Sequence, residues 1–305
     1  MAKASWASQI ADETAGAGTP GPATRERMMQ VVHAADMAWS EKEERHREGG
    51  LAFKNLFRGD NGDPDNFRLV LSRNGGEYQS PHHRHNFDQI RYCVSGPANI
   101  APGKTLEEGD IGYFPEGAFY GPQHDEGRAR VTLVMQFGGT SGLGFMSSDQ
   151  MRRGLEELEA TGHFAGGQYR RHGEAEGRDS YEAIWEHVFQ RPIAYPPARY
   201  TDPLLIRPAA FEWRPDQARP GVRHKKLGAF TERPLTLEFV ALDPGAAVDL
   251  GEAGAMVLAF VISGEGRCAQ GDWKTHTAIR LDGADRLTLT ASSQAQLLLI
   301  TVPRL

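Results

Sequence analysis

Short apolar runs separated by Gly, Pro, Asn and Asp recur along most of the chain. Runs of this length between turn-forming residues predict β-strands rather than helices. In the first half we expect strands at 67–72, 89–94, 111–114 and 130–137. In the second half we expect them at 235–242, 256–262 and 287–303. Short strands at this spacing are typical of a β-sandwich or barrel, so the predicted fold class is all-β.

A helical pattern interrupts the strands between the two halves. Ser147 offers an N-cap for a helix over 151–159, and Asp179 caps a second helix. The apolar faces of the two helices consist of Leu155 and Leu158 and of Tyr181, Ile184, Trp185 and Val188. We therefore predict a helical linker at 147–200.

Length and composition predict how the rest of the chain is divided into domains. The 305 residues exceed the usual size of one domain and suggest two. Residues 1–24 are rich in Ala, Gly, Thr and Pro and lack apolar periodicity, which predicts a flexible N-terminal arm. We place an N-terminal barrel at 25–146 and a C-terminal barrel at 201–305.

Candidate chemistry gathers between residues 80 and 121. His83 and His85 are two apart, so in a strand both imidazoles leave the same face and can converge on one ion. A lone His-x-His is more often an ordinary surface pair. The sequence at 86–88 has turn chemistry, and a reversal there would bring Gln89 beside the imidazoles with Arg91 on the same face.

The spacing of these residues resembles the two motifs of the cupin superfamily. The first motif is matched by Gly76, His83, His85, Gln89 and Gly96, and the second by Gly109, Pro115 and Gly117. Two positions depart from the family. Gln89 replaces an acidic ligand, and Tyr120 replaces the last histidine, with His124 where the family has Asn.

The resemblance implies two tandem cupin-type barrels, each a double-stranded β-helix or jelly roll. It implies a metal site of His83, His85 and Gln89, with Tyr120 or His124 as the fourth ligand. The expected ion is a divalent transition metal, with iron foremost and zinc, nickel, manganese or copper as alternatives. A likeness to bicupins also implies a homodimer.

Tyr120 and Arg91 are the candidate catalytic residues. As a phenolate, Tyr120 would restore the charge lost with the acidic ligand and favour oxidised iron. As a neutral phenol it would exchange a proton with the substrate. A buried Arg91 needs a partner, and an anionic substrate is one candidate. The alternative is that Arg91 reaches the barrel mouth or pairs with Glu116 or Asp110.

An internal repeat links the two halves. Aligning Ser263-Gly264 with Ser95-Gly96 relates the second barrel to the first. Opposite His83, His85, Gln89 and Arg91 it places Gly251, Ala253, Val257 and Ala259. The second barrel is therefore expected to keep the fold and to lack the chemistry.

Charge and composition narrow the function classes. A net charge of −6 argues against general nucleic-acid binding, and no apolar run is long enough to span a membrane. Cys93 and Cys268 lie far apart, so we expect no disulfide framework and a cytoplasmic location.

The leading hypothesis is a metal-dependent enzyme acting on a small anionic or enolisable molecule. Because many bicupins are dioxygenases, the resemblance implies a dioxygenase-like oxidation. Two alternatives stay open: a bicupin that binds or senses a small molecule without catalysis, and a metal-dependent isomerase or lyase.

Overall fold

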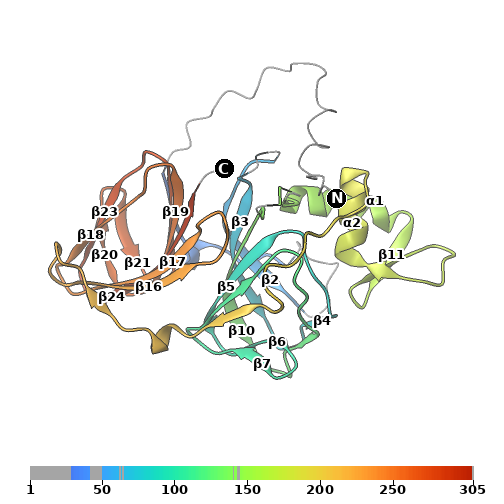
Figure 1. The fold of residues 1–305 in the computed structure, drawn as a ribbon, viewed down its shortest axis with the longest axis horizontal. Coiled ribbons are helices and arrows are strands. Elements are labelled where there is room, and N and C mark those ends of the chain that lie inside the picture. The colour runs from blue at the N-terminus through green and yellow to red at the C-terminus, as the bar shows by residue number, and fades with distance from the viewer. Residues whose placement is uncertain are drawn as a thin grey trace, which may run out of the picture.

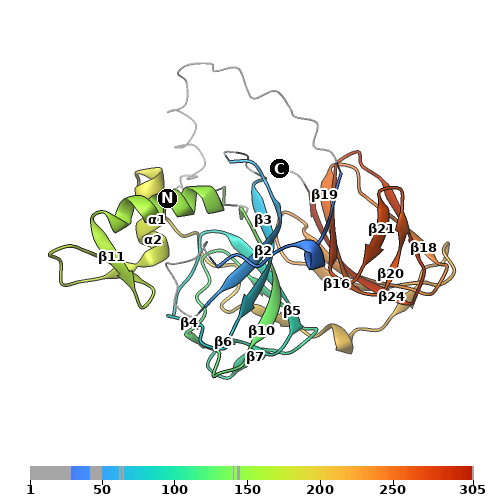
Figure 2. The same cartoon turned by 180° about the vertical axis from the view of Figure 1, so that it is seen from behind.

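The chain folds into two β-barrels side by side, with a helical module against the first (Figure 1; Figure 2 from behind). The computed structural model describes residues 29–41, 50–61, 63, 65–139, 141–142 and 145–303. The predicted arm at 1–24 lies outside this part. Over the described ranges, neither α-helix has the length and apolarity that a membrane span requires. The all-β prediction is confirmed.

The large sheet of the N-terminal barrel is antiparallel. In spatial order its strands are β14 (Leu204–Ile206), β8 (Ile111–Phe114), β5 (Asp88–Ser95), β10 (Arg130–Phe137), β3 (Phe67–Asn74) and β2 (Ala52–Arg58). Two short ladders complete this barrel. They are β4 (Gln79–Ser80) with β9 (Gln123–His124), and β6 (Ala98–Ala101) with β7 (Lys104–Leu106).

The C-terminal barrel is built from a seven-stranded sheet and a four-stranded sheet. The first contains β1 (Gln30–His33), β22 (Thr277–Asp282), β19 (Ala255–Ser263), β24 (Ala295–Pro303), β17 (Thr236–Leu242), β16 (Val222–Ala229) and β15 (Arg214–Pro215). The second contains β18 (Ala247–Leu250), β23 (Leu287–Ala291), β20 (Glu265–Cys268) and β21 (Gly271–Lys274). Two 3₁₀ turns, Ala34–Asp36 and Pro208–Ala210, follow β1 and β14.

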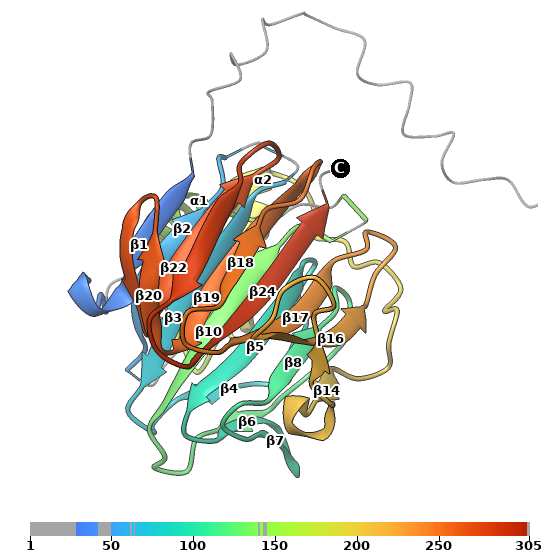
Figure 3. The same cartoon turned by 90° about the vertical axis from the view of Figure 1, so that its left-hand side faces the viewer.

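Each barrel takes one edge strand from the other half of the sequence. Strand β1 pairs with β22, with Gln30 opposite Arg280, and β14 pairs with β8, with Ile206 opposite Ile111. Figure 3 shows both exchanged strands at the sheet edges. The predicted boundaries assign β1 to the first barrel and β14 to the second, and the sheets depart from that division at both strands.

The segment between the barrels is more than two helices. Helix α1 (Ser148–Glu159) begins at a capping box made by Ser147 and Gln150, and α2 (Ser180–Phe189) is capped by Asp179. Both predicted caps are therefore confirmed. Between the helices lies a small sheet of β11 (Gly162–Ala165), β12 (Gln168–Arg171) and β13 (Arg178–Asp179). We call residues 145–200 the helical module.

The interiors of the two barrels differ. In the C-terminal barrel, apolar side chains fill the core, and Val257 and Ala259 are 4% and 1% exposed within it. A second apolar cluster joins the two barrels, where Tyr92 of β5 meets Phe239 of β17 edge-to-face at 5.9 Å. The N-terminal barrel instead carries polar and charged side chains on its inner surface, and these form the candidate site.

Candidate functional site

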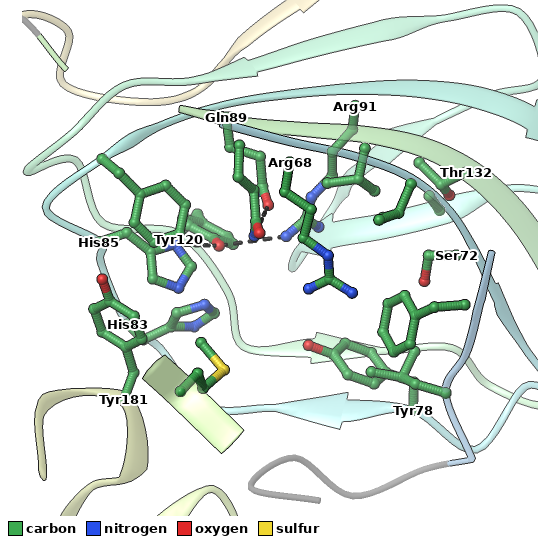
Figure 4. Close-up of a pocket in the computed structure, with 18 of the residues that line it drawn as sticks. Arg68, Ser72, Tyr78, His83, His85, Gln89, Arg91, Tyr120, Thr132 and Tyr181 are labelled. Atoms are coloured by element: carbon green, nitrogen blue, oxygen red, sulfur yellow. Dashed lines mark hydrogen bonds between the residues drawn. The ribbon is translucent and has the colours of Figure 1, made fainter. Parts of the chain in front are cut away.

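The N-terminal barrel encloses a pocket with about 860 Å³ of empty space, including the part open to solvent. The polar side chains that line it are Arg68, Ser72, Tyr78, His83, His85, Gln89, Arg91, Tyr120, Arg130, Thr132, Gln136 and Tyr181. In Figure 4 the imidazoles and Tyr181 lie at one end, and Ser72, Tyr78 and Thr132 at the other. The guanidinium groups of Arg68 and Arg91 lie between these ends.

His83 is held by its backbone and by its ring. The chain at His83 pairs with Tyr120, whose N–H and C=O complete hydrogen bonds of 2.9 and 3.0 Å. The ring Nδ1 lies 2.7 Å from the Pro81 carbonyl oxygen and 3.2 Å from Ser80 Oγ. A carbonyl only accepts, so Nδ1 carries the proton and Nε2 carries the lone pair. The ring is 6% exposed and therefore presents a basic nitrogen in a largely dry setting.

His85 lies next to His83, with ring centroids 5.0 Å apart. Its ring stacks on Phe87 at 4.4 Å and meets Tyr181 edge-on at 5.1 Å. Its carbonyl oxygen accepts from Gly117 N–H at 2.8 Å. Gly117 has φ +78°, and an added Cβ would lie 2.3 Å from the Pro196 carbonyl oxygen, so only glycine fits this turn.

Tyr120 connects the imidazoles to the nearest guanidinium. Its hydroxyl oxygen lies 3.0 Å from His85 Nδ1, and Arg91 Nη2 donates to that oxygen at 3.3 Å. The Arg91 guanidinium also lies over the rings of Phe114 and Tyr120, at 4.5 and 5.3 Å. The predicted catalytic pair is therefore brought together, and a proton can pass between the phenol and His85 without water.

Gln89 comes into the pocket, but its amide faces neighbours other than the imidazoles. Its Oε1 accepts from Gln136 Nε2 at 2.9 Å in one amide orientation. In the flipped orientation the oxygen accepts from Arg91 Nε and Nη2, at 2.9 and 3.0 Å. Gln89 thus orients Arg91 in this arrangement. Bends at 86–87 precede β5, as the turn chemistry predicts.

His124 is the predicted ligand that the structure does not bring to the site. It lies exposed on β9 and is not part of the pocket lining. Its neighbour Gln123 points inward instead, and its Nε2 donates to the Asn99 carbonyl at 2.9 Å. Strand alternation explains the difference, because only one of two successive side chains can face the barrel interior.

The charged side chains of the described residues that line the pocket are positive, apart from the two histidines. Arg68, Arg91 and Arg130 all line the pocket, and no Asp or Glu of the described chain does so. Arg130 pairs with buried Asp125 at 2.6 Å, behind the lining. Within the described ranges no carboxylate lies within 4.0 Å of Arg91, and Glu116, one of its expected partners, pairs with Arg199 at 2.8 Å.

Burial shifts the pKa values of two charged groups around the pocket, Arg130 and Asp125. Desolvation lowers the pKa of Arg130 although Asp125 opposes this, and the nearby Arg91 lowers it further. Desolvation also raises the pKa of Asp125, against the attraction of Arg130 and Arg91. The charge of Arg91 therefore disfavours the charged form of Arg130, and an incoming anion would relieve this effect.

A buried carboxylate pair supports the turn beneath the site. Burial raises the pKa of Asp88 to about 6, although Glu116 N–H donates to its Oδ1 at 2.8 Å. The charge of Glu116 raises this pKa further and that of Arg199 lowers it. These contacts fix the start of β5 against the turn at 115–117, which carries the chain to Tyr120.

The residues fit an imidazole-bound metal in part. His83 and His85 converge, and the Nδ1 of each ring has a hydrogen-bond partner, the Pro81 carbonyl oxygen for His83 and the Tyr120 hydroxyl for His85. In the part of the chain that the structure describes, no three His, Cys, Asp or Glu side chains are placed to share an ion. Among the described residues, the candidate ligands are therefore the two histidines, with Tyr120 beside them.

Several lining residues were not expected from the sequence. Arg68 and Arg130 sit in apolar strands, where a charged residue usually marks a solvent-facing position. Tyr181 belongs to the second helix, and its spacing to apolar neighbours indicates packing alone. Its hydroxyl donates to Asn86 Oδ1 at 2.8 Å, which ties the helical module to the turn after His85.

Comparisons with known proteins agree with the two-barrel fold. No protein-family model and no curated protein matches the sequence. Among solved structures, one from Nostoc punctiforme PCC 73102 described as a putative dioxygenase has a TM-score of 0.62 at 11% identity. The match covers 92% of this chain and 85% of that chain.

Two further structures carry metals in their descriptions. A bacterial pirin from Escherichia coli in complex with nickel(II) has a TM-score of 0.52 at 12% identity, covering 91% of this chain and 100% of that chain. An oxalate decarboxylase from Bacillus subtilis, studied for its Mn(II) centres, has a TM-score of 0.51 at 15% identity, covering 90% and 77%. At these identities the likeness establishes the bicupin fold.

Proposed function

We propose, from the bicupin fold and the chemistry of its first barrel, that this protein is an enzyme acting on a small organic anion. The observation that carries the proposal is the pocket lining. It combines two converging imidazoles and a phenol with three guanidinium groups, and no described carboxylate lines it. Guanidinium groups bind carboxylates and enolates through charged hydrogen bonds.

The chain's own groups have separate tasks in this proposal. Arg91 holds the anion, and Gln89 and Tyr120 keep its guanidinium in place. Tyr120 Oη, 3.0 Å from His85 Nδ1, accepts or returns a proton beside the bound molecule. The apolar wall of Phe87, Phe145 and Met151 excludes water from that end of the pocket.

A divalent transition metal is part of the proposed enzyme, and His83 and His85 would hold it. Nickel and manganese in the two metal-containing neighbours support a metal of this kind. When bound, such an ion would supply Lewis-acid or redox chemistry, including an oxidation by dioxygen. The dioxygenase description of one neighbour supports an oxidation over the isomerase or lyase alternative.

The test compares binding and turnover. Purified protein is incubated with Fe²⁺, Mn²⁺ or Ni²⁺ and with acetate, pyruvate, malonate or citrate, in air and without oxygen. Binding of a carboxylate that is lost in Arg91→Gln, with oxygen-dependent consumption of that carboxylate, supports the proposal. Consumption that continues without oxygen identifies an isomerase or lyase. No binding of any of these anions contradicts the proposal.

One observation favours a second candidate, a bicupin that binds its anion without catalysis. Gln89 is committed to Gln136 and Arg91, so the predicted third ligand does not face the imidazoles. Anion binding with no metal in the purified protein, and no turnover with any added metal, would establish this candidate instead.

A further inference from the structure

The end of the pocket that lies opposite the imidazoles is lined by hydroxyl groups. Thr132 of β10 and Ser72 of β3 face each other in the register of the sheet, and both line the pocket together with Tyr78. Figure 4 shows the three side chains at this end. We call Ser72, Tyr78 and Thr132 the hydroxyl end of the pocket. None of the three has a task in the proposed reaction.

Thr132 is buried, and its hydroxyl has no hydrogen-bond partner. The residue is 4% exposed, and Oγ1 is unpaired among the described residues. A buried hydroxyl without a partner destabilises a folded protein, and valine has nearly the same shape without this penalty. Because the side chain lines the pocket, turning between staggered positions about Cα–Cβ would aim its oxygen at a bound molecule. Thr132 therefore offers a hydrogen-bonding group that the protein itself does not use.

The cation beside the hydroxyl end already has a partner. Arg130 lies two residues before Thr132 on the same strand, lines the pocket and pairs with Asp125 at 2.6 Å. Their side chains are 8% and 0% exposed, so the pair is shielded from solvent. A carboxylate placed at this end would be repelled by Asp125 and would lack a cation of its own. An uncharged oxygen fits better, because each hydroxyl of this end can donate or accept.

The register of the sheet gives the span between this end and the anion-binding Arg91. Arg91 is paired with Val134 and Thr132 with Cys93, so Arg91 and Thr132 lie on neighbouring strands, two residues apart along them. Strand rise and strand spacing then separate their Cα atoms by roughly 8 Å. Extended carboxylic acids of four to six carbon atoms have a comparable length. One small molecule can therefore contact both residues.

From these observations we infer that the hydroxyl end binds a second, uncharged oxygen of the substrate. The anion that the first barrel takes is then a hydroxy or keto carboxylic acid, with its second oxygen several bonds from the carboxylate. Arg91 binds the carboxylate, and Thr132 hydrogen-bonds the second oxygen. This inference rests on the proposed function and narrows its substrate class. It makes Thr132 a residue that determines specificity and takes no part in proton transfer.

Ligands matched in length test the inference. Butanoate, 4-hydroxybutanoate and succinate differ only at the fourth carbon, and hexanoate, 6-hydroxyhexanoate and adipate repeat the comparison at the sixth. Calorimetric titration measures each Kd. We expect one of the two hydroxy acids to bind roughly threefold to tenfold more tightly than the plain acid of its length, because it gains one neutral hydrogen bond. The dicarboxylate of that length should bind no more tightly than the hydroxy acid.

Variants assign this preference to Thr132. Thr132→Val should abolish it and leave the Kd of the plain acid nearly unchanged, and Thr132→Ser, which keeps a hydroxyl, should retain it. Thr290→Val, on the exposed face of β23, is the matched control and should also retain it. Two ligands and two proteins form a double-mutant cycle that isolates the contact. Urea unfolding should show Thr132→Val to be at least as stable as the wild type, because its hydroxyl has no partner to lose.

The outcomes separate this inference from the proposed function. Equal affinity for the hydroxy and plain acids at both lengths, with binding that is lost in Arg91→Gln, overturns the inference and leaves the anion pocket standing. A preference for the dicarboxylate, or a preference for the hydroxy acid that survives in Thr132→Val, overturns it as well. Failure of all six acids to bind, together with pyruvate and citrate, overturns both.

Discussion

Arg91 is the residue of the pocket lining that is placed to bind an anion. It is half-buried, it contacts Gln89 and Tyr120, and no carboxylate of the described chain pairs with it. An anion about 4 Å from a cation is attracted by about 4 kcal/mol at an effective dielectric constant of 20. The cluster of guanidinium groups therefore favours an anionic occupant over a neutral one of the same shape.

Arg91→Gln should weaken carboxylate binding by roughly tenfold to a hundredfold, because a hydrogen bond to a charged group contributes about 1.5–3 kcal/mol. The matched control is Arg128→Gln, which changes an exposed arginine of the same barrel. Calorimetric titration with pyruvate measures both. Equal losses in the two variants would show that net charge alone is responsible.

Asp88 gives the fold a pH dependence. Its pKa rises from 3.8 to about 6 on folding, so the folded protein binds the proton more tightly and loses stability as the pH rises through this range. A shift of about two pKa units corresponds to about 3 kcal/mol. Asp88→Asn should remove up to this amount of the stability change between pH 4 and pH 7.

Urea unfolding of the wild type and of Asp88→Asn at several pH values checks this. The free energy of unfolding of the variant should fall less than that of the wild type as the pH rises. Parallel curves would mean that Asp88 titrates in the folded protein as it does in the unfolded chain.

Helix α2 and strand β5 are the elements that shape the histidine end of the pocket. Tyr181 of α2 contacts His85 edge-on and hydrogen-bonds Asn86 in the bend before β5. Both Tyr181 and Asn86 are buried, at 2% and 0% exposure. The helical module is therefore a wall of the site as well as a connection between barrels.

Tyr181→Phe should lower the free energy of unfolding by about 1–3 kcal/mol, because it leaves the buried Asn86 oxygen without its donor. It should also weaken Mn²⁺ binding, since Asn86, the residue after His85, loses its hydrogen bond to α2. Tyr195→Phe, which removes a half-buried hydroxyl bonded to Glu182, is the matched control. Unchanged Mn²⁺ affinity in Tyr181→Phe would restrict α2 to a structural role.

At the level of elements, local patterns were informative. The strands at 111–114 and 130–137 lie where the apolar runs predict them, and both predicted helix caps are present. These features depend on residues that are close in the sequence, so they can be read from one sequence alone. The role of Tyr181 depends on tertiary packing, which helical periodicity cannot reveal.

The whole molecule depends on long-range pairings that no local pattern indicates. Strands β1 and β14 cross between the barrels, and an apolar cluster joins the two large sheets. In the same way, Arg68 and Arg130 look like surface positions of their strands until the barrel closes around them. The histidine pair, Gln89 and Arg91 could be located in advance because they occupy one short segment, whereas the contribution of Arg68 and Arg130 to the pocket could not.

Cutting the chain at the predicted boundary should therefore destabilise both halves. A fragment of residues 201–305 lacks β1, and a fragment of residues 1–200 lacks β14. Each would also expose its side of the shared apolar cluster. We expect the intact chain to unfold in one cooperative thermal transition and the separate fragments to lose native circular dichroism. A stable 201–305 fragment with an unchanged Tm would contradict this.

The central claim is that the first barrel holds a small organic anion beside its two histidines. A crystal structure with Mn²⁺ and pyruvate, with anomalous data at the manganese edge, tests it most directly. We predict one anomalous peak bound by Nε2 of His83 and of His85, with a carboxylate oxygen between the metal and Arg91. An empty pocket, or a carboxylate and a metal bound at separate places on the surface, would contradict the account.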